Sequence, residues 1–162
     1  MRTHLLTLSL AFLATAAFAE NKEITVEAGG KAAFKMSVPK NAEVKTKGEK
    51  TTIQAPDLRI YIWHVPTAKT VADVTPHVTD VIKDEFVQYA VKSTDAIKVA
   101  GHDAQHLKGK GEEADDNDPG TADVVIFTDG KDVFAACVHG EKEEAAKERP
   151  EFLKALESIK VP

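Results

Sequence analysis

Acidic side chains gather in one short stretch of the sequence, where residues 112–118 hold five carboxylates in seven positions. Such a run repels itself and is expected to form an exposed loop. Carboxylates are also the ligands that calcium prefers, since this ion takes about six to eight oxygen atoms. The alternating ligands of an EF-hand are missing, because Pro119 stands where another ligand would be needed. If a cation binds here, we expect Asp116 and Asp118 to hold it, with Asp115 third; otherwise the run is a solvated loop.

Histidines supply a second candidate metal site. His102 and His106 are four positions apart, and on a strand their Cα atoms would lie roughly 13 Å apart at ~3.3 Å per residue. A shared zinc or copper ion would therefore need a bend or bulge between them, and about three or four such ligands. His64 and His139 each end a predicted strand and would converge only if those strands are neighbours. The alternative is a set of ordinary, partly exposed histidines.

Nucleophilic catalysis has little support in the sequence. Cys137 and His139 are two positions apart and would share one face of a strand, the arrangement of a thiolate pair in a small hydrolase. We favour the other interpretation, in which Cys137 is a small core side chain inside the apolar run 133–138. No serine stands in a Gly-x-Ser-x-Gly elbow, and no glycine pattern fits a phosphate loop. The sequence thus predicts a protein that is not an enzyme and carries no cofactor.

Strands are predicted for the first part of the chain after residue 20. Residues 24–26 and 32–38 alternate apolar with polar or small side chains on either side of a two-glycine turn. Residues 43–47 and 51–55 form a less apolar pair, which suggests a place near a sheet edge. Residues 58–65 are apolar on both faces, which predicts a central strand covered on both sides.

A helix is predicted next, because apolar residues then recur at spacings of three and four. Thr70 with Asp73 fits an N-terminal capping box. Pro76 is awkward inside a helix, so a second interpretation starts the main helix at Pro76 with Thr75 as its cap. In both cases we expect residues 77–90 to be helical.

The remainder of the chain predicts a second group of strands and a last helix. Turn signals lie at Gly101-His102-Asp103 and Asp129-Gly130. The last helix is expected either as one piece or as two that meet at Pro150. The expected strands are residues 97–99, 104–111, 122–128 and 132–139, and the expected helix is residues 141–159.

The chain has 162 residues, 43% of them hydrophobic, which fits one folded domain over residues 20–162. Residues 1–19 read as an export signal, with a positive start, an apolar run at 5–17 and small residues that place the cut after Ala19. That run is too short to span a ~30 Å hydrocarbon core. We therefore expect a periplasmic or secreted protein with no membrane insertion after cleavage.

The formal net charge is −5, which argues against binding nucleic acid or anionic lipid through bulk charge. The order of elements, with two groups of strands each followed by a helix, indicates a mostly antiparallel sheet with helices packed on it, an α+β fold.

Residues 30–160 of the chain resemble the Mog1/PsbP-like families, which include short exported bacterial proteins of unknown function. The resemblance implies an α/β/α sandwich that serves as a binding or assembly module, and it brings no catalytic set with it. The matching signatures are Phe34-x-x-x-Val38-Pro39, Val99-x-Gly101-x-x-Ala104 and Phe152-Leu153-x-x-Leu156-x-x-Ile159.

Together these observations predict an exported, non-catalytic module that binds a protein partner or a small ligand. The alternative is a metal-ion-binding protein that uses a histidine cluster, such as His102 with His106, or the acidic residues 112–118. Neither the partner nor the oligomeric state follows from the sequence.

Overall fold

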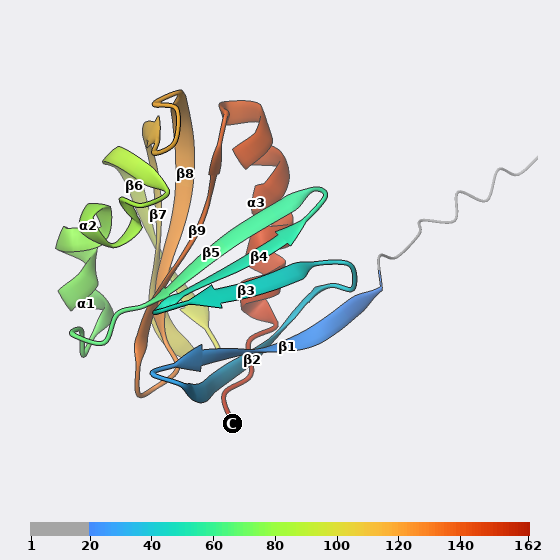
Figure 1. The fold of residues 1–162 in the computed structure, drawn as a ribbon. Helices are drawn as coiled ribbons and strands as arrows, with labels where there is room; N and C mark the ends of the chain where they lie inside the picture. Colours follow the sequence, from blue (N-terminus) through green and yellow to red (C-terminus); the bar gives the residue numbers. More distant parts are fainter. Residues whose placement is uncertain (1–19) are drawn as a thin grey trace, which may run out of the picture.

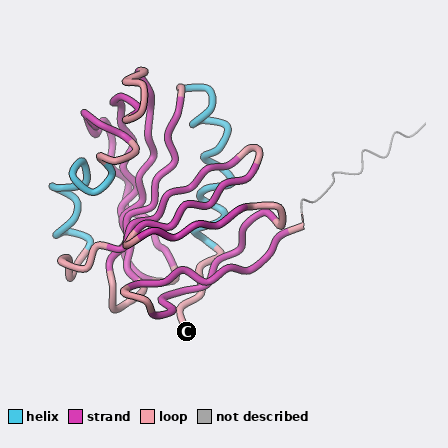
Figure 2. The backbone as a smooth tube through the Cα atoms, viewed as in Figure 1, coloured by secondary structure: helices cyan, strands magenta, loops and turns pink. Residues whose placement is uncertain are grey.

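The computed structural model describes residues 20–162, so the predicted leader and its cleavage point lie outside the described residues. Strands make up most of the described chain; short helical segments follow β5, and one longer helix follows β9 (Figures 1 and 2). The strands are β1 (Asn21–Ala28), β2 (Lys31–Pro39), β3 (Glu43–Lys47), β4 (Lys50–Ala55), β5 (Leu58–His64), β6 (Phe86–Val99), β7 (His102–Glu113), β8 (Pro119–Thr128) and β9 (Val133–Gly140). The helical segments are α1 (Val71–Val74), η1 (Thr75–His77), α2 (Val78–Ile82) and α3 (Lys142–Glu157).

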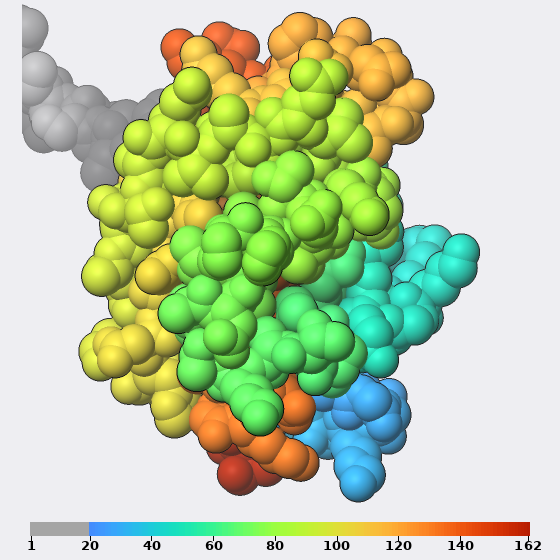
Figure 3. All heavy atoms as spheres, turned by 90° about the vertical axis from the view of Figure 1, so that its left-hand side faces the viewer, coloured from blue at the N-terminus to red at the C-terminus, as the bar shows by residue number. Residues whose placement is uncertain are grey.

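Seven strands form one antiparallel sheet in the order β3-β4-β5-β9-β8-β7-β6, and β1 and β2 form a separate hairpin. Helix α3 and the β1–β2 hairpin pack on one face of the large sheet, which we call the α3 face. The segment α1–α2 covers the opposite face, the α1–α2 face (Figures 1 and 3). These layers confirm the α+β, α/β/α sandwich expected from the sequence.

The middle strands bury side chains on both faces of the sheet. In β8, Val125 and Phe127 enter the core beneath α3, whereas Val124 and Ile126 enter the core beneath α1–α2. Strand β5 does the same, as the sequence predicted, and lies between β4 and β9. Strand β3 is exposed along its whole length and forms one edge of the sheet, again as expected.

The predicted helix over residues 77–90 is correct only at its start. Helical turns end at Ile82, and strand β6 begins at Phe86. The register of β6 against β7 shifts between Val87 and Ala90, where Gln88 has a φ of 53°. This bulge buries both Phe86 and Tyr89, three positions apart, and so produces a helix-like spacing of apolar residues inside a strand.

The predicted start of the helical segment is confirmed. The hydroxyl of Thr70 accepts a hydrogen bond from the backbone N–H of Asp73, and the Asp73 carboxylate accepts one from the backbone N–H of Thr70. Pro76 lies in the 3₁₀ turn η1, which separates α1 from α2. The second interpretation is wrong about the cap, because Thr75 ends α1 and its hydroxyl donates to Val71 O, whereas α2 begins only at Val78. At the other end of the chain, α3 is one helix with Pro150 inside it.

Two glycines of β7 let aromatic rings lie against its backbone. A Cβ atom at Gly109 would come 2.4 Å from the ring of Tyr89, and one at Gly111 would come 2.6 Å from the ring of Phe86. Both rings belong to the bulged start of β6. The two glycines thus fix how closely β6 and the end of β7 pack.

A buried ionic contact ties α3 to the sheet. The carboxylate of Asp123 in β8 accepts hydrogen bonds from Arg149 Nε and Nη2 at 2.8 and 2.7 Å, and its Oδ1 lies 2.7 Å from His106 Nε2. The Asp123 side chain is 1% exposed. Burial opposes ionisation of Asp123, but the hydrogen bonds from His106 and Arg149 outweigh it and hold its pKa below the ordinary value.

We expect Asp123→Asn to lower the free energy of unfolding at neutral pH by about 3 kcal/mol, because it removes one partner of a buried ion pair. Since the folded-state pKa is lowered, this stability is present above the unfolded pKa of about 3.9 and is lost as the pH falls through the folded value. Urea unfolding at several pH values should show the two proteins converge in acid. Asp95→Asn, at an exposed ion pair with Lys108, is the control and should change little. A difference that persists in strong acid would contradict this account.

Candidate binding site

A cleft of about 600 Å³ opens at one end of the large sheet. We call it the charged cleft, because most of its lining side chains are ionisable. The lining residues are Asn41, Glu43, Gln54, Ala55, Pro56, Asp57, Leu58, Arg59, Glu113, His139, Gly140, Glu144, Lys147 and Glu148.

The strand register explains why distant segments meet at this cleft. Strand β5 runs antiparallel to β9 with Tyr61 opposite Cys137, so the start of β5 lies beside the end of β9. The end of β9 pairs with the start of β8, which in turn pairs with the end of β7. Helix α3 begins two residues after β9. The ends of β7 and β9 and the starts of β5, β8 and α3 thus meet at one end of the sheet.

Negative charge predominates in the charged cleft. Its lining includes the five carboxylates of Glu43, Asp57, Glu113, Glu144 and Glu148, against the cations of two residues, an arginine and a lysine. Burial raises the pKa of Glu148, although this carboxylate accepts a hydrogen bond from a backbone N–H of β5. The cleft therefore favours a ligand that carries positive charge.

His139 lies at the inner wall of the charged cleft, with its side chain 7% exposed. Its ring stacks on Tyr61 with centroids 5.2 Å apart and also contacts Phe86. Burial lowers the pKa of His139, so the ring is neutral at neutral pH. Neither ring nitrogen has a hydrogen-bond partner; Nδ1 lies 3.8 Å from Glu113 Oε1 and Nε2 lies 4.0 Å from Glu85 Oε2.

The residues that recur at spacings of three and four from Val71 to Tyr89 form an apolar stripe. Its one charged member is Glu85, which pairs with Lys50. Lys50 Nζ donates to Glu85 Oε1 at 2.5 Å and to Asp84 Oδ2 at 2.6 Å. Trp63 Nε1 donates to the other oxygen of Asp84 at 3.2 Å. This network joins β4 and β5 to the turn before β6. It also satisfies one oxygen of Glu85 and leaves the other toward His139.

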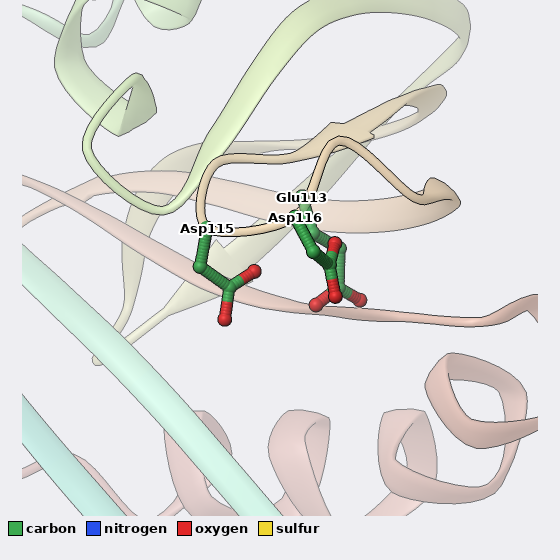
Figure 4. A group of neighbouring side chains, drawn as sticks. All are labelled: Glu113, Asp115 and Asp116. Carbon is green, nitrogen blue, oxygen red and sulfur yellow. The ribbon is translucent and has the colours of Figure 1, made fainter.

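The acidic residues that the sequence marked as a loop divide between a strand end and a turn. Glu112 and Glu113 finish β7, and residues 114–118 form the turn. The carboxylates of Glu113, Asp115 and Asp116 place one oxygen each within 4.8 Å of one another, and they point to the same side of the turn (Figure 4). We call these three residues the acidic triad.

The residues predicted as metal ligands are placed in different parts of the molecule. Asp116 belongs to the acidic triad, and so does Asp115. Asp118 does not; its backbone N–H donates to Asp116 Oδ1 at 2.9 Å. His106 is committed to Asp123, and His102 lies four residues earlier on the same unbroken strand. The structure therefore gives no histidine pair of the kind that a shared zinc or copper ion would need within residues 102–106.

The two histidines at strand ends do not meet either. Strands β5 and β9 are neighbours, but they run antiparallel, and His64 lies opposite Phe134. His64 is thus at the far end of the sheet from His139. There its Nδ1 contacts Glu49 Oε2 at 2.5 Å. Antiparallel pairing places the last residues of two neighbouring strands at opposite ends of the sheet.

The prediction that Cys137 is a core residue is confirmed. Its side chain is fully buried on the α1–α2 face, and burial raises the pKa of the thiol well above its ordinary value. A protonated, enclosed thiol is not a nucleophile. The hydroxyl of Ser158 is likewise occupied, since it donates to Ala155 O and accepts from the backbone N–H of Ser37.

Comparison with known proteins yields similarity in fold and none in sequence. No protein-family model matches the chain, and no curated protein matches it. Among solved structures, cyanobacterial PsbP (CyanoP) from Synechocystis superposes with a TM-score of 0.60 at 12% identity, covering 91% of this chain and 96% of CyanoP. A protein of unknown function from Pseudomonas aeruginosa gives 0.51 at 10% identity, with 86% and 96% covered.

A third solved structure, from Bacteroides thetaiotaomicron, gives a TM-score of 0.58 at 15% identity over 87% of this chain. The chain spans about half the length of that protein, 48%. These likenesses confirm a Mog1/PsbP-like fold. At such low identity they establish the fold alone.

Sequence reasoning named His139 and the acidic run but did not connect them. Glu113 was counted among the acids without a role, and Arg59 and Glu144 were not singled out. One usable signal was Glu85, a lone charge in an apolar stripe. Another was Asp123, a lone acid in the apolar run 122–128, which requires a buried partner.

The burial of Cys137 leads to a simple chemical test. We expect the thiol of the folded protein to resist alkylation by iodoacetamide in mildly alkaline buffer, because it is enclosed and protonated. The same reagent should label it readily in guanidinium chloride. Mass spectrometry of both samples measures the extent of labelling. Rapid labelling of the folded protein would show that the thiol is accessible and would reopen the nucleophile interpretation.

Proposed function

We propose that residues 20–162 form an exported, non-catalytic module that binds a protein partner or a small ligand in the charged cleft. The observation that carries this proposal is the cleft itself, which is open, about 600 Å³ in volume and lined by ionisable side chains from several segments. Concave sites with convergent polar groups are the usual places for ligands to bind.

The charge of the cleft supports a particular kind of occupant. Five carboxylates line it, and the Asp57 carboxylate already pairs with Lys147 Nζ at 2.6 Å. Arg59 is then the remaining arginine or lysine of the lining. A ligand or partner segment that carries amines or guanidinium groups would find complementary charge here.

The lining supplies charge for binding but no hydroxyl or thiol nucleophile. The residues that line the charged cleft include no serine, threonine, cysteine or tyrosine. The described chain also places its single cysteine in the core, outside the cleft. No helix of residues 20–162 is long and apolar enough to cross a membrane. Export rests on the leader sequence at residues 1–19.

A matched pair of variants on α3 tests the proposal. Glu144 and Glu143 are both exposed residues in the first turn of α3, but only Glu144 lines the cleft. Both substitutions to lysine change the charge equally and disturb the helix dipole alike. We expect Glu144→Lys to weaken binding at least about tenfold through charge repulsion, and Glu143→Lys to leave it nearly unchanged.

The measurement is co-purification of tagged, native-exported protein, followed by native mass spectrometry for small ligands. A chelator is present throughout, so that bound cations do not contribute. A stoichiometric partner or ligand that wild type and Glu143→Lys retain, and Glu144→Lys loses, is the expected result. Equal retention by both variants, or no stoichiometric partner or ligand at all, would count against the cleft as the binding site.

A further inference from the structure

Within residues 20–162, no lysine or arginine forms an ion pair with the carboxylates of the acidic triad. Among residues 20–162, the ion pairs of lysine and arginine go to other carboxylates, such as those of Asp84, Asp95 and Asp103. The triad carboxylates instead lie within 4.8 Å of one another. Like charges this close repel, so the arrangement is unfavourable unless something positive lies between them.

An unpartnered buried side chain points at the triad from a different strand. The side chain of His139 is more than nine-tenths buried, and both of its ring nitrogens lack a hydrogen-bond partner. Its Nδ1 lies 3.8 Å from Glu113 Oε1, slightly too far for a hydrogen bond. A buried polar group without a partner is costly, so the site is incomplete as it stands.

We propose that the acidic triad binds a divalent cation of the calcium class, with Glu113, Asp115 and Asp116 as ligands and His139 as a positioning residue. His139 Nδ1–H donates a hydrogen bond to Glu113 once that carboxylate turns toward the cation. Carboxylates that bind metal ions are commonly oriented by such a partner.

The geometry of the triad fits an oxygen-coordinated ion. Calcium binds oxygen at about 2.4 Å, so two ligand atoms on opposite sides of the ion are about 4.8 Å apart. The three oxygens lie within that limit. Asp115 and Asp116 are exposed, which leaves room for water to complete the coordination. The three ligands are all carboxylates, with no thiolate or imidazole among them, which favours calcium over zinc.

The turn prepares one ligand in particular. The backbone N–H of Asp118 donates to Asp116 Oδ1, which orients that carboxylate within the turn. Asn117, at a φ of 62°, donates its N–H to Glu113 O and closes the turn back onto β7. Asp118 thus acts through its backbone, and its side chain is outside the triad.

The neighbouring elements add one carboxylate to the field at the triad. Glu144 at the start of α3 adds a negative field at Glu113, and Arg59 in β5 acts in the opposite direction with a smaller effect. Glu85, from the turn before β6, lies 4.0 Å from His139 Nε2, but its charge is paired with Lys50.

The test is calorimetric titration of the purified protein with calcium chloride, in parallel with its unfolding temperature. We expect saturable binding of one ion per chain, with a Kd in the range of about 10⁻⁴ to 10⁻³ M that is typical of extracellular calcium modules, and a rise in the unfolding temperature. Glu113→Gln and Asp116→Asn should each weaken binding at least tenfold. Asp118→Asn, in the same turn and with the same change of charge, is the matched control and should stay within about twofold.

The role of His139 has its own readout. His139→Phe keeps a ring against Tyr61 but removes the donor, so calcium affinity should fall about threefold to tenfold, while near-ultraviolet circular dichroism without calcium stays unchanged. His139→Gln restores a donor and should recover part of the affinity. An equal loss in both variants would remove His139 from the site.

Three results would overturn the cation site: no saturable calcium binding, equal losses in Asp118→Asn and Asp116→Asn, or binding of zinc in preference to calcium. This titration uses the isolated protein, whereas the partner experiment is done with a chelator. Failure of one proposal is therefore distinguishable from failure of the other.

Discussion

The large sheet must be covered on both faces, and the rest of the structure follows from that constraint. Its middle strands β5, β9 and β8 carry apolar side chains above and below the sheet. Helix α3 and the β1–β2 hairpin bury one face, and α1–α2 buries the other. Exposing either face would bring a core with several aromatic rings into contact with water, at a cost of about 25 cal/mol per Å² of apolar surface. The connections that join the sheet to the covering layers therefore have to pass an edge or an end of the sheet.

The functional features arise where those connections turn. The ends of β7 and β9 and the starts of β5 and α3 meet at one end of the sheet, and polar residues occur there because the cores lie elsewhere. The Asp123–Arg149 contact holds α3 in place on the same sheet. The charged cleft and the acidic triad are thus supported by rigid elements, even though several of their side chains are on turns.

The sequence was informative wherever a pattern was local. Strand 58–65, the capping box at Thr70 and the exposed edge at residues 43–47 could all be predicted, because each depends on neighbouring residues. The start of β6 could not, since a bulge at Gln88 gives Phe86 and Tyr89 the spacing of a helix. Apolar and polar residues alternate along a strand only where the strand pairs with its neighbour without a bulge.

The candidate site was harder to predict, because it depends on which strands pair. His139 and Glu113 are on strands that are separated by β8, and neither has a local motif. The antiparallel pairing of β5 with β9 separates His64 from His139 and brings Arg59 close instead. Nothing in the residues near either histidine indicates that pairing. The acidic run was visible in the sequence, but its division into ligands and a turn was not.

The exposed strand β3 has a consequence for how the molecule behaves among its own copies. An unpaired sheet edge offers backbone groups to any extended chain that approaches, and this is a common start of aggregation. Here the edge reads Glu-Val-Lys-Thr-Lys, and all five residues are exposed. A strand that docked there would have to strip water from ammonium and carboxylate groups. The charged side chains of β3 therefore disfavour edge-to-edge pairing between copies of this chain.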